Sequence, residues 1–431
     1  MADFWLLPFN TTTLHATKPN TASLDPVMFL MLQTPYFPLF TSLFLCVLVL
    51  FWKRFKARGL KSPPPGPWKL PVIGSLHHMV GPLPHHTLRD LAKKHGPIMH
   101  LKLGQLEAVI ISSSKAAQEV LKTHELTFSQ RPLVLAVQVM SFGQASIAFA
   151  PYADFWRELR KICVFELLSA KRVQSFRSIR EEEVGNLVES ISSVSQQGVA
   201  INFSEKCFNC SFFNFFLAMQ DIFSAGSETL ATAIEWTMSE LMRNPRVMKK
   251  AQAEVRQVAL EGKKNRIEEA DVQKMDYLKS VVKETLRLHP PTPLLPREAR
   301  ERCQISGYEL PLKSKVIVNE WALGRDVESW GVDAECFKPE RFHGSSVDFK
   351  GLDFEFIPFG AGRRICLGIT FGVTMIELAL SQLLCHFDWK LANGIKPEEV
   401  DMTETFGVTC RRKSDLHLIA TPRFRLLNES E

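Results

Sequence analysis

One cysteine in the C-terminal part of the chain lies in a loop that could present its sulfur to a metal. Cys366 has Gly362 and Gly368 on its two sides, and a long apolar segment with a helical pattern, 369–385, follows at once. Glycines let the backbone approach closely and leave amide N–H groups free to point at the sulfur. The start of a helix adds positive potential, which favours thiolate over thiol. Taken alone, such a cysteine is more often a buried structural residue in a glycine-rich turn.

A second group combines one acid with two bases. Glu284 and Arg287 are three positions apart in the segment 276–289, whose pattern is helical, so they lie on one helix face. Arg341 follows in the sequence Pro-Glu-Arg-Phe. By itself, a Glu–Arg pair at this spacing is usually a solvated surface pair.

A third group lies in the long helical stretch 221–243, where Ala225 begins the sequence Ala-Gly-Ser-Glu-Thr. Gly226 weakens the helix by roughly 1 kcal/mol relative to alanine, but it leaves room for a small molecule. The hydroxyl of Thr229 could hydrogen-bond that molecule, and Glu228 could relay protons from solvent as a general acid. The plainer interpretation is an amphipathic helix with a Gly-Ser flaw.

Together these groups resemble the motifs of one family. Residues 359–368, Phe-Gly-Ala-Gly-Arg-Arg-Ile-Cys-Leu-Gly, match the ligand loop of the cytochrome P450 family at every defining position, and the other groups stand in the family's order. The resemblance implies that the cofactor is haem b and that Cys366 is the axial ligand of its iron. Electron donation from such a thiolate promotes cleavage of the O–O bond. The implied activity is that of a monooxygenase, which inserts one oxygen atom from O2 into a C–H bond.

The resemblance also assigns roles to residues. It implies oxygen activation by Gly226, Glu228 and Thr229. It implies a buried ionic triad behind the haem loop, formed by Glu284, Arg287 and Arg341. The residues expected to bind the cofactor are Trp156, Arg160, Arg297, Phe359, Gly362, Arg364 and Gly368. Trp156 and Arg160 are one helical turn apart and are expected to bond the haem propionates together.

The substrate and the partners are likewise expected from the resemblance. The pocket segments are expected at 133–146, 218–228, 292–295 and 406–409, and their mostly apolar residues suit a hydrophobic small molecule. The chain looks most like plant microsomal members that oxidise terpenoids, and a diterpene of a casbene-type pathway is the first expectation. Electrons are expected from an NADPH-dependent cytochrome reductase.

A basic face could dock that acidic reductase. Its candidate residues are Arg157, Lys161 and Arg363. Ordinary solvated charge explains these residues about as well.

The segments that must position these groups are mostly helical. Periodicity predicts helices at 86–94, 115–123, 153–165, 170–190, 221–243, 276–289 and 369–385, and short strands at 98–103, 108–112 and 316–319. Asn244-Pro245 is expected to cap a further helix. The expected fold class is mostly α with a small β region near the N-terminal end of the body, as in the cytochrome P450 fold, plus one N-terminal transmembrane helix.

The N-terminal part is predicted to anchor the body in the endoplasmic reticulum membrane by a single pass, with the body in the cytoplasm. Residues 27–52 carry no charge, and about 20 apolar residues suffice to span a bilayer. Basic residues follow at once, which fixes the orientation; they are Lys53, Arg54, Lys56, Arg58 and Lys61. A cleaved signal peptide fits less well, because its charges would precede the apolar part.

The expected division of the chain follows from that anchor. A disordered tail over 1–26 precedes the anchor over 27–52, and Met28 or Met31 is an equally good start. A basic and proline-rich hinge over 53–67 leads to the haem domain over 68–425.

One interval is shorter than the resemblance requires. Only residues 206–220 lie where intact members have several helices, including the pair that roofs the substrate pocket. A helix rises only about 1.5 Å per residue, so this interval cannot supply them, and the fold is expected to lack part of the distal roof. An alternative function is therefore a catalytically inactive membrane-bound remnant or a mis-spliced product. A haem isomerase that needs no O2 is a further alternative, against which Thr229 argues.

Composition excludes other classes. Of the 431 residues, 45% are hydrophobic, as in a globular enzyme. The net charge of +6 is mild and forms no broad basic stripe, so no nucleic acid is expected as a partner. The nine cysteines have no paired framework, which suits a reducing compartment.

Overall fold

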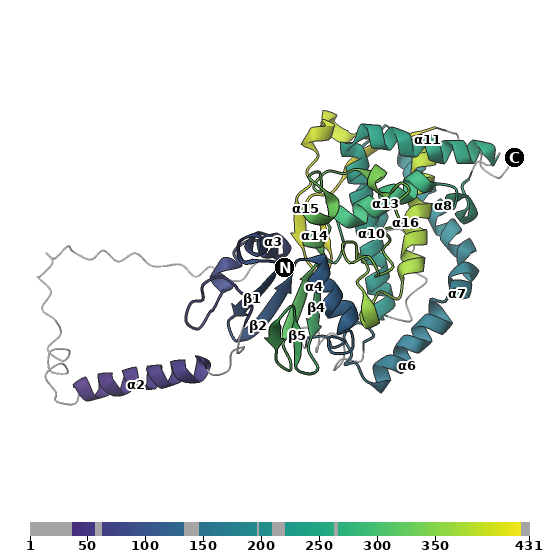
Figure 1. Cartoon of the computed structure of the whole chain (residues 1–431). Helices are drawn as coiled ribbons and strands as arrows, with labels where there is room; N and C mark the ends of the chain where they lie inside the picture. Colours follow the sequence, from purple (N-terminus) through teal and green to yellow (C-terminus); the bar gives the residue numbers. More distant parts are fainter. Residues whose placement is uncertain are drawn as a thin grey trace, which may run out of the picture. The chain divides into compact units, whose positions relative to one another are not determined.

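The computed structural model describes residues 37–56, 63–132, 146–195, 198–208, 220–262 and 266–423 (Figure 1). The chain divides into two compact units, Met1–Gly59 and Leu60–Glu431. In the first unit, the described element is helix α2 (Phe37–Lys56), whose shorter stretch Leu39–Val49 is apolar and exposed. The tail over 1–26 and the first part of the predicted anchor lie outside the described residues.

A four-stranded sheet in the second unit has the order β1-β2-β7-β4. Its strands are β1 (Ile98–Leu103), β2 (Leu106–Ile111), β7 (Lys315–Asn319) and β4 (Leu294–Glu298). Strands β2 and β7 are parallel, and the two outer pairs are antiparallel. Because side chains alternate along a strand, one face of the sheet packs on helix α3 (Pro84–His95) and the other on α4 (Ser114–Gln118).

The expectation that the β region lies near the N-terminal end of the body is therefore incomplete. Strands β4 and β7 of the main sheet come from the second half of the chain, and smaller sheets lie elsewhere. In these, β11 (His417–Pro422) pairs with both β3 (Ile201–Asn202) and β8 (Phe387–Leu391), β5 (Cys303–Ile305) pairs with β6 (Tyr308–Leu310), and β9 (Glu404–Phe406) pairs with β10 (Cys410–Arg412). Pairing between distant segments leaves no local pattern in the sequence, so short strands of this kind are easily missed.

Helices build the larger apolar core of the second unit. Helix α10 (Gln220–Arg243) contacts α16 (Ile369–His386), α13 (Asp276–Leu288), α11 (Pro245–Glu261) and α9 (Phe203–Phe208). In Figure 1, α10 and α16 lie below α11 and to the left of α8. Helix α16 is the one described helix long and apolar enough to cross a membrane, and 67% of it is buried. This burial matches its place in the core.

The remaining helices connect these parts. They are η1 (Leu76–His78), η2 (Glu119–Thr123), α6 (Asp154–Ile162), η3 (Cys163–Leu167), α7 (Ala170–Ser175), α8 (Arg177–Ser195), α12 (Glu269–Val272), α14 (Glu320–Leu323), α15 (Val327–Trp330), η5 (Pro339–Phe342), η6 (Gly362–Arg364), η7 (Ala392–Gly394) and η8 (Pro397–Glu399).

Three helices predicted as continuous are divided in the structure. The segments 115–123 and 153–165 end in the π-helical turns η2 and η3, and 170–190 is interrupted at Phe176. Periodicity follows the buried face and does not register a change in the backbone hydrogen bonds. Asn244 stands at the start of α11, but its amide donates to Glu240 and does not cap the helix as predicted.

Candidate functional site

The cysteine loop is shaped by its own backbone. Cys366 N donates to Phe359 O at 2.9 Å, which closes the loop immediately before α16. Gly362 has a φ of +69°, and a Cβ there would collide with the carbonyl oxygen of Leu121. Only glycine therefore fits this position. A Cβ at Gly368 would lie 3.9 Å from the Cys366 sulfur, so the start of α16 is close to the thiol.

The thiol lies among groups that act on its protonation in opposite directions. Cys366 as a whole is exposed, yet burial of its sulfur raises the pKa of the thiol. The backbone N–H of Gly368 and the guanidinium of Arg160 act to lower that pKa. A positive group and an N–H donor directed at the sulfur are what a bound thiolate needs.

Two arginines and a tryptophan pack beside this loop. The guanidinium of Arg364 lies 4.2 Å from the centre of the Trp156 ring and that of Arg160 lies 5.3 Å from it. Arg160 also donates to Ile365 O at 3.1 Å, next to Cys366. The Trp156 indole donates to Ile147 O at 2.8 Å. The predicted pair Trp156 and Arg160 is thus brought to the cysteine loop, with the indole N–H bonded to the backbone.

Further arginines make this region strongly positive. Burial, together with Arg131 and Arg364, holds the pKa of Arg297 well below its usual range. Burial likewise lowers the pKa of Arg131 to about 10 and that of Arg364 to about 9. Like charges this close repel, so an anion placed among them would be stabilised.

Hydrogen bonding in the same region is incomplete. Arg364 donates to Ser129 O at 2.8 Å and to Ala150 O at 2.6 Å, yet its buried Nη1 has no partner within the described part of the chain. The buried Nε of Arg131 is in the same position. Orphaned guanidinium N–H groups are unfavourable in an interior unless an acceptor is supplied. The carboxylates of haem propionates are acceptors of this kind, so the residues present fit the cofactor.

Arg131 was not predicted from the sequence. It joins the cluster because Arg131 and Arg297 both donate to Pro296 O, at 3.2 and 2.9 Å. The sequence feature that could have indicated a role for Arg131 was its position in Gln-Arg-Pro, directly before the predicted pocket segment 133–146. Most of that segment lies outside the described residues.

The first turns of α10 contain the residues predicted to activate oxygen. A Cβ added at Gly226 would meet no atom within 4 Å, so space is open beside the helix. Thr229 Oγ1 donates to Ala225 O at 2.6 Å, as a mid-helix threonine often does. Leu230 packs near Gly372 at the start of α16, which brings this turn of α10 close to the cysteine loop. Of the predicted pocket, 218–219 lie outside the described residues.

The carboxylate of Glu228 is held by a residue that is distant in sequence. Thr409 Oγ1 donates to Glu228 Oε1 at 2.6 Å. Thr409 lies between strands β9 and β10 and is buried. The resemblance placed both residues in pocket segments, 218–228 and 406–409, but it did not indicate this hydrogen bond.

The predicted triad is assembled in the interior. Glu284 and Arg287 form a forked pair, with Nε to Oε2 at 2.7 Å and Nη2 to Oε1 at 2.8 Å. Arg341 Nε contacts Glu284 Oε1 at 2.9 Å, and Lys338 N donates to the same oxygen at 2.7 Å. Arg287 also donates to the carbonyls of Ala334 and Cys336. The buried carboxylate of Glu284 therefore joins helix α13 to η5, which contains Arg341.

The predicted basic face carries less free charge than the sequence suggests. Arg157 is paired with Asp154, Lys161 lies 4.0 Å from Glu158, and Arg363 contacts Glu125 at 2.8 Å. Since all three cations are exposed and paired, they give no strong positive patch on their own.

Comparison with known proteins agrees with these features. The family model "Cytochrome P450" matches residues 63–219 and 214–419. The chain is 47% identical to melianol synthase from Citrus sinensis over 506 residues, covering 91% of this chain and 97% of that protein. It is 42% identical to premnaspirodiene oxygenase from Hyoscyamus muticus, covering 88% and 97%. A solved zebrafish cytochrome P450 superposes with a TM-score of 0.69 at 21% identity, covering 79% of this chain and 100% of that one.

The same comparisons show that this chain is shorter than its relatives. An alignment over 506 residues is longer than the 431 residues of this chain, so the Citrus sinensis protein has residues that face none here. The two family segments meet at 214–219.

The predicted mostly helical fold with small sheets is thereby confirmed. Each comparison with a relative covers most of both chains, and the family match takes in nearly all of the second unit. The chain belongs to the cytochrome P450 family of plant type, and it is a monooxygenase by class whose cofactor is haem iron with a cysteine thiolate ligand.

Proposed function

We propose that Cys366 supplies the thiolate and that the chain inserts one oxygen atom from O2 into a hydrophobic terpenoid, using electrons from an NADPH-dependent cytochrome reductase. The observation that carries this proposal is the placing of a glycine-flanked cysteine beside four arginines, two of which have orphaned buried N–H groups. When bound, the haem supplies the activation of O2.

The chain's own residues would then hold the cofactor and move protons. Arg131, Arg160, Arg297 and Arg364 would bind the propionates, since their charges and free N–H groups match carboxylates. Phe359, Gly362 and Gly368 would shape the loop around the sulfur. The turn at Gly226 would leave room for O2, Thr229 would hydrogen-bond it, and Glu228 would relay protons from solvent.

The ligand assignment is tested by spectroscopy. The reduced chain exposed to CO is expected to show the red-shifted Soret band of thiolate-ligated haem, and Cys366→Ala is expected to lose it. Cys336→Ala is a matched control, because Cys336 is also an exposed free cysteine. Retention of the band by Cys366→Ala would assign the ligand to another residue.

The substrate class is supported by the names of the similar proteins. Melianol synthase and premnaspirodiene oxygenase are terpenoid enzymes, and 5-epiaristolochene 1,3-dihydroxylase from Nicotiana tabacum is 42% identical to this chain. The finer proposal is a diterpene. A panel of terpenoids of each size, scored by substrate-induced spectral shift, separates these classes, and binding of non-terpenoid hydrophobes alone would contradict the assignment.

The cellular setting is also proposed. Residues 27–52 would form a single-pass anchor in the endoplasmic reticulum membrane, and 53–67 would link it to a cytoplasmic haem domain over 68–425. Support comes from the exposed apolar stretch Leu39–Val49 and from the basic residues that follow. Protease added to sealed microsomes is expected to degrade the body. Complete protection of the body would contradict the proposed orientation.

One observation favours a second, reduced function, which is that of a haem-binding remnant with little monooxygenase turnover. The interval 206–220 is short, and relatives align over more positions than this chain has. Without the roof helices, water would reach the distal face, and reduced oxygen would be lost as peroxide because water exclusion prevents such side reactions.

Reconstitution with reductase, NADPH and the terpenoid panel decides between the two. Under the reduced function, most NADPH oxidised by this chain is expected to appear as peroxide, with little oxidised product. Coupled turnover, with product matching NADPH, would show that the short interval is compatible with catalysis.

A further inference from the structure

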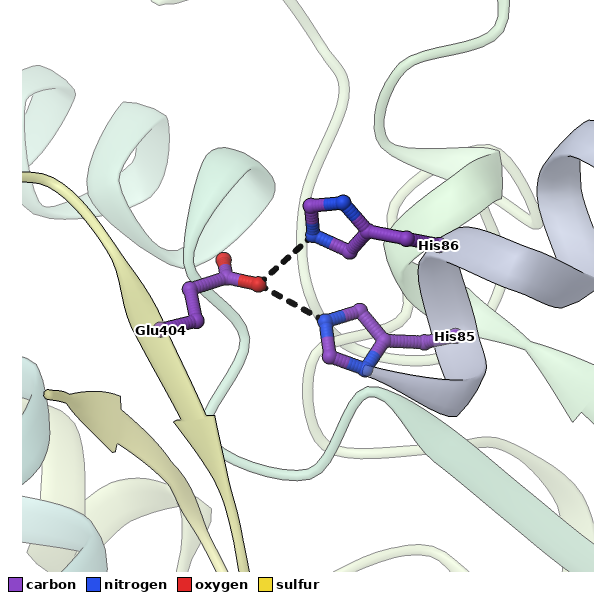
Figure 2. A group of neighbouring side chains, drawn as sticks. All are labelled: His85, His86 and Glu404. Carbon is purple, nitrogen blue, oxygen red and sulfur yellow. Dashed lines mark hydrogen bonds and ion pairs between the residues drawn. The ribbon is translucent and has the colours of Figure 1, made fainter. Parts of the chain in front are cut away.

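The hairpin of strands β9 and β10 is fastened at its base by a cluster that no motif indicated. Glu404 Oε2 accepts hydrogen bonds from His85 Nε2 at 2.7 Å and from His86 Nε2 at 2.8 Å, as Figure 2 shows. Its other oxygen, Oε1, accepts from the indole N–H of Trp321 at 3.2 Å. Three elements, α3, α14 and β9, therefore meet at one buried carboxylate.

The electrostatics of this cluster stabilise a carboxylate. Burial by itself would raise the pKa of Glu404, but the hydrogen bonds from His85 and His86, together with attraction to His85 and His289, hold that pKa far below its usual range. His85 and His86 also lie in the first turn of α3, whose positive end favours an anion. The guanidinium of Arg325, stacked 3.8 Å from the Trp321 ring centre, is attracted to Glu404.

A metal ion fits the same three residues less well. Two ligand atoms on one tetrahedral zinc are roughly 3.3 Å apart when each bond is about 2.0 Å, whereas the atoms here are 2.7 and 2.8 Å apart. Metal-bound imidazoles nearly always donate their second N–H, but His85 Nδ1 has no partner among the described residues. A helix start and Arg325 would also repel a cation. The carboxylate itself is the ion that this cluster holds.

From this base the hairpin runs along helix α10. The Trp236 indole donates to Cys410 O at 3.1 Å, and Arg412 Nη1 donates to Ser239 Oγ at 2.6 Å. Cys410 N donates to Pro291 O at 2.8 Å. At the tip, Thr409 reaches Glu228. The position of Thr409 is thus constrained by the hydrogen bonds that the N–H and the carbonyl of its neighbour Cys410 make.

We propose that Thr409 is a positioning residue that fixes the carboxylate of Glu228, and that Glu404 with His85 and His86 fixes the hairpin that holds Thr409. The inference rests on the proton-relay role proposed above for Glu228. Oε1 is engaged by the Thr409 hydroxyl, and no hydrogen bond with a described residue engages Oε2. The second oxygen is therefore the one left to take a proton from solvent and give it up.

Fixing matters because a glutamate side chain is flexible. Holding such a side chain in one rotamer costs conformational entropy. A short hydrogen bond from a buried hydroxyl provides this restraint without adding charge. Thr409 is buried, and its backbone is tied to its surroundings, so the donor needs little ordering of its own.

The infrared carboxylate band of Glu228 tests the proposal in the full chain, with or without turnover. The band is isolated as the difference between the chain and its Glu228→Gln variant. Thr409→Val removes the hydroxyl at nearly constant shape, and it is expected to shift and broaden this band. Thr409→Ser keeps the hydroxyl, so its band is expected to have the position and width of the parent band.

The two halves of the proposal fail separately. An unmoved band in Thr409→Val, or no restoration in Thr409→Ser, would overturn the role of Thr409. Glu404→Gln and the milder His86→Ala are each expected to broaden the same band, and an unmoved band in both would overturn the role of the cluster. Stoichiometric zinc in the purified chain that is lost in His86→Ala would show a metal site in its place. None of these readouts depends on product formation, so failure of the proposed monooxygenase activity is distinguishable.

Discussion

Two buried carboxylates in the second unit are held in different ways. Glu284 is surrounded by cations, because Arg287 and Arg341 both contact it. Glu404 is held largely by neutral donors, which include the indole of Trp321 and the imidazole of His85, whose pKa burial lowers. Removal of a cation from the first group strands a charge in the interior, whereas removal of one donor from the second leaves the others in place.

A third acid, Glu377 in α16, has neither arrangement. Burial raises the pKa of its carboxyl to about 7, and Lys279 and Lys283 act only in the opposite direction from a distance. Glu404 and Glu377 are both buried, yet the pKa of Glu404 is lowered and that of Glu377 is raised, so burial alone does not decide protonation. The partners do.

The largest expected effect is on the triad. Arg287→Ala should destabilise the fold by about 3–5 kcal/mol, because it leaves Glu284 buried without its forked partner and removes donors to three carbonyls. Chemical unfolding and the yield of folded chain measure this loss. Arg287→Lys is the matched control, since it keeps the charge and loses the fork. Equal stability of Arg287→Ala and the parent would mean that the triad contributes nothing.

A pH-dependent effect is expected at Glu377. Between the ordinary carboxyl pKa of about 4.5 and the folded value of about 7, the native state keeps a proton that the unfolded state has released. Stability should therefore fall as pH rises through this window, by up to about 1.4 kcal/mol per pH unit. Glu377→Gln should remove that slope and raise the melting temperature at pH 8. A slope that survives in Glu377→Gln belongs to another group.

The opposite sign is expected at Glu404. Its lowered pKa gives stability that is present above the ordinary carboxyl value of 4.5 and is lost as pH falls below it. The lowered pKa of His85 acts in the same direction below its ordinary value of 6.5. Glu404→Gln should cost about 1–3 kcal/mol at pH 7 and flatten the acid side of a stability–pH curve. An acid limb as steep as that of the parent would show that Glu404 does not cause it.

The smallest effect is expected at an exposed pair. Arg246 contacts Glu340 at 2.9 Å on the surface. Arg246→Ala should change stability by less than about 1 kcal/mol and less still at high salt, because exposed ion pairs are screened. Thermal unfolding at low and high salt provides the measurement. A loss comparable to that of Arg287→Ala would remove the distinction between buried and exposed pairing.

The sequence by itself determined the motifs that identify the family and its cofactor. These motifs are short patterns that can be recognised in a single sequence. They are the loop 359–368, the pair Glu284 and Arg287, and the Gly-Ser-Glu-Thr sequence in α10. They predicted the family and the cofactor, which the comparisons support, and the long helices, which the structure contains. Local patterns work here because a thiolate loop and a helix face are defined by residues a few positions apart.

Only the tertiary structure decided which distant residues meet. Thr409 and Glu228 are separated by 181 positions, and His85 and Glu404 by 319. Arg131 became part of the positive cluster only because β4 runs beside it, with Pro296 O as the shared acceptor. Strand β4 was missed for the same reason: the paired strands β5 and β6 lie between it and its partner β7 in the sequence, so the two do not form a tight hairpin. Contacts between remote segments depend on how buried surfaces pack, and no single stretch of sequence contains that information.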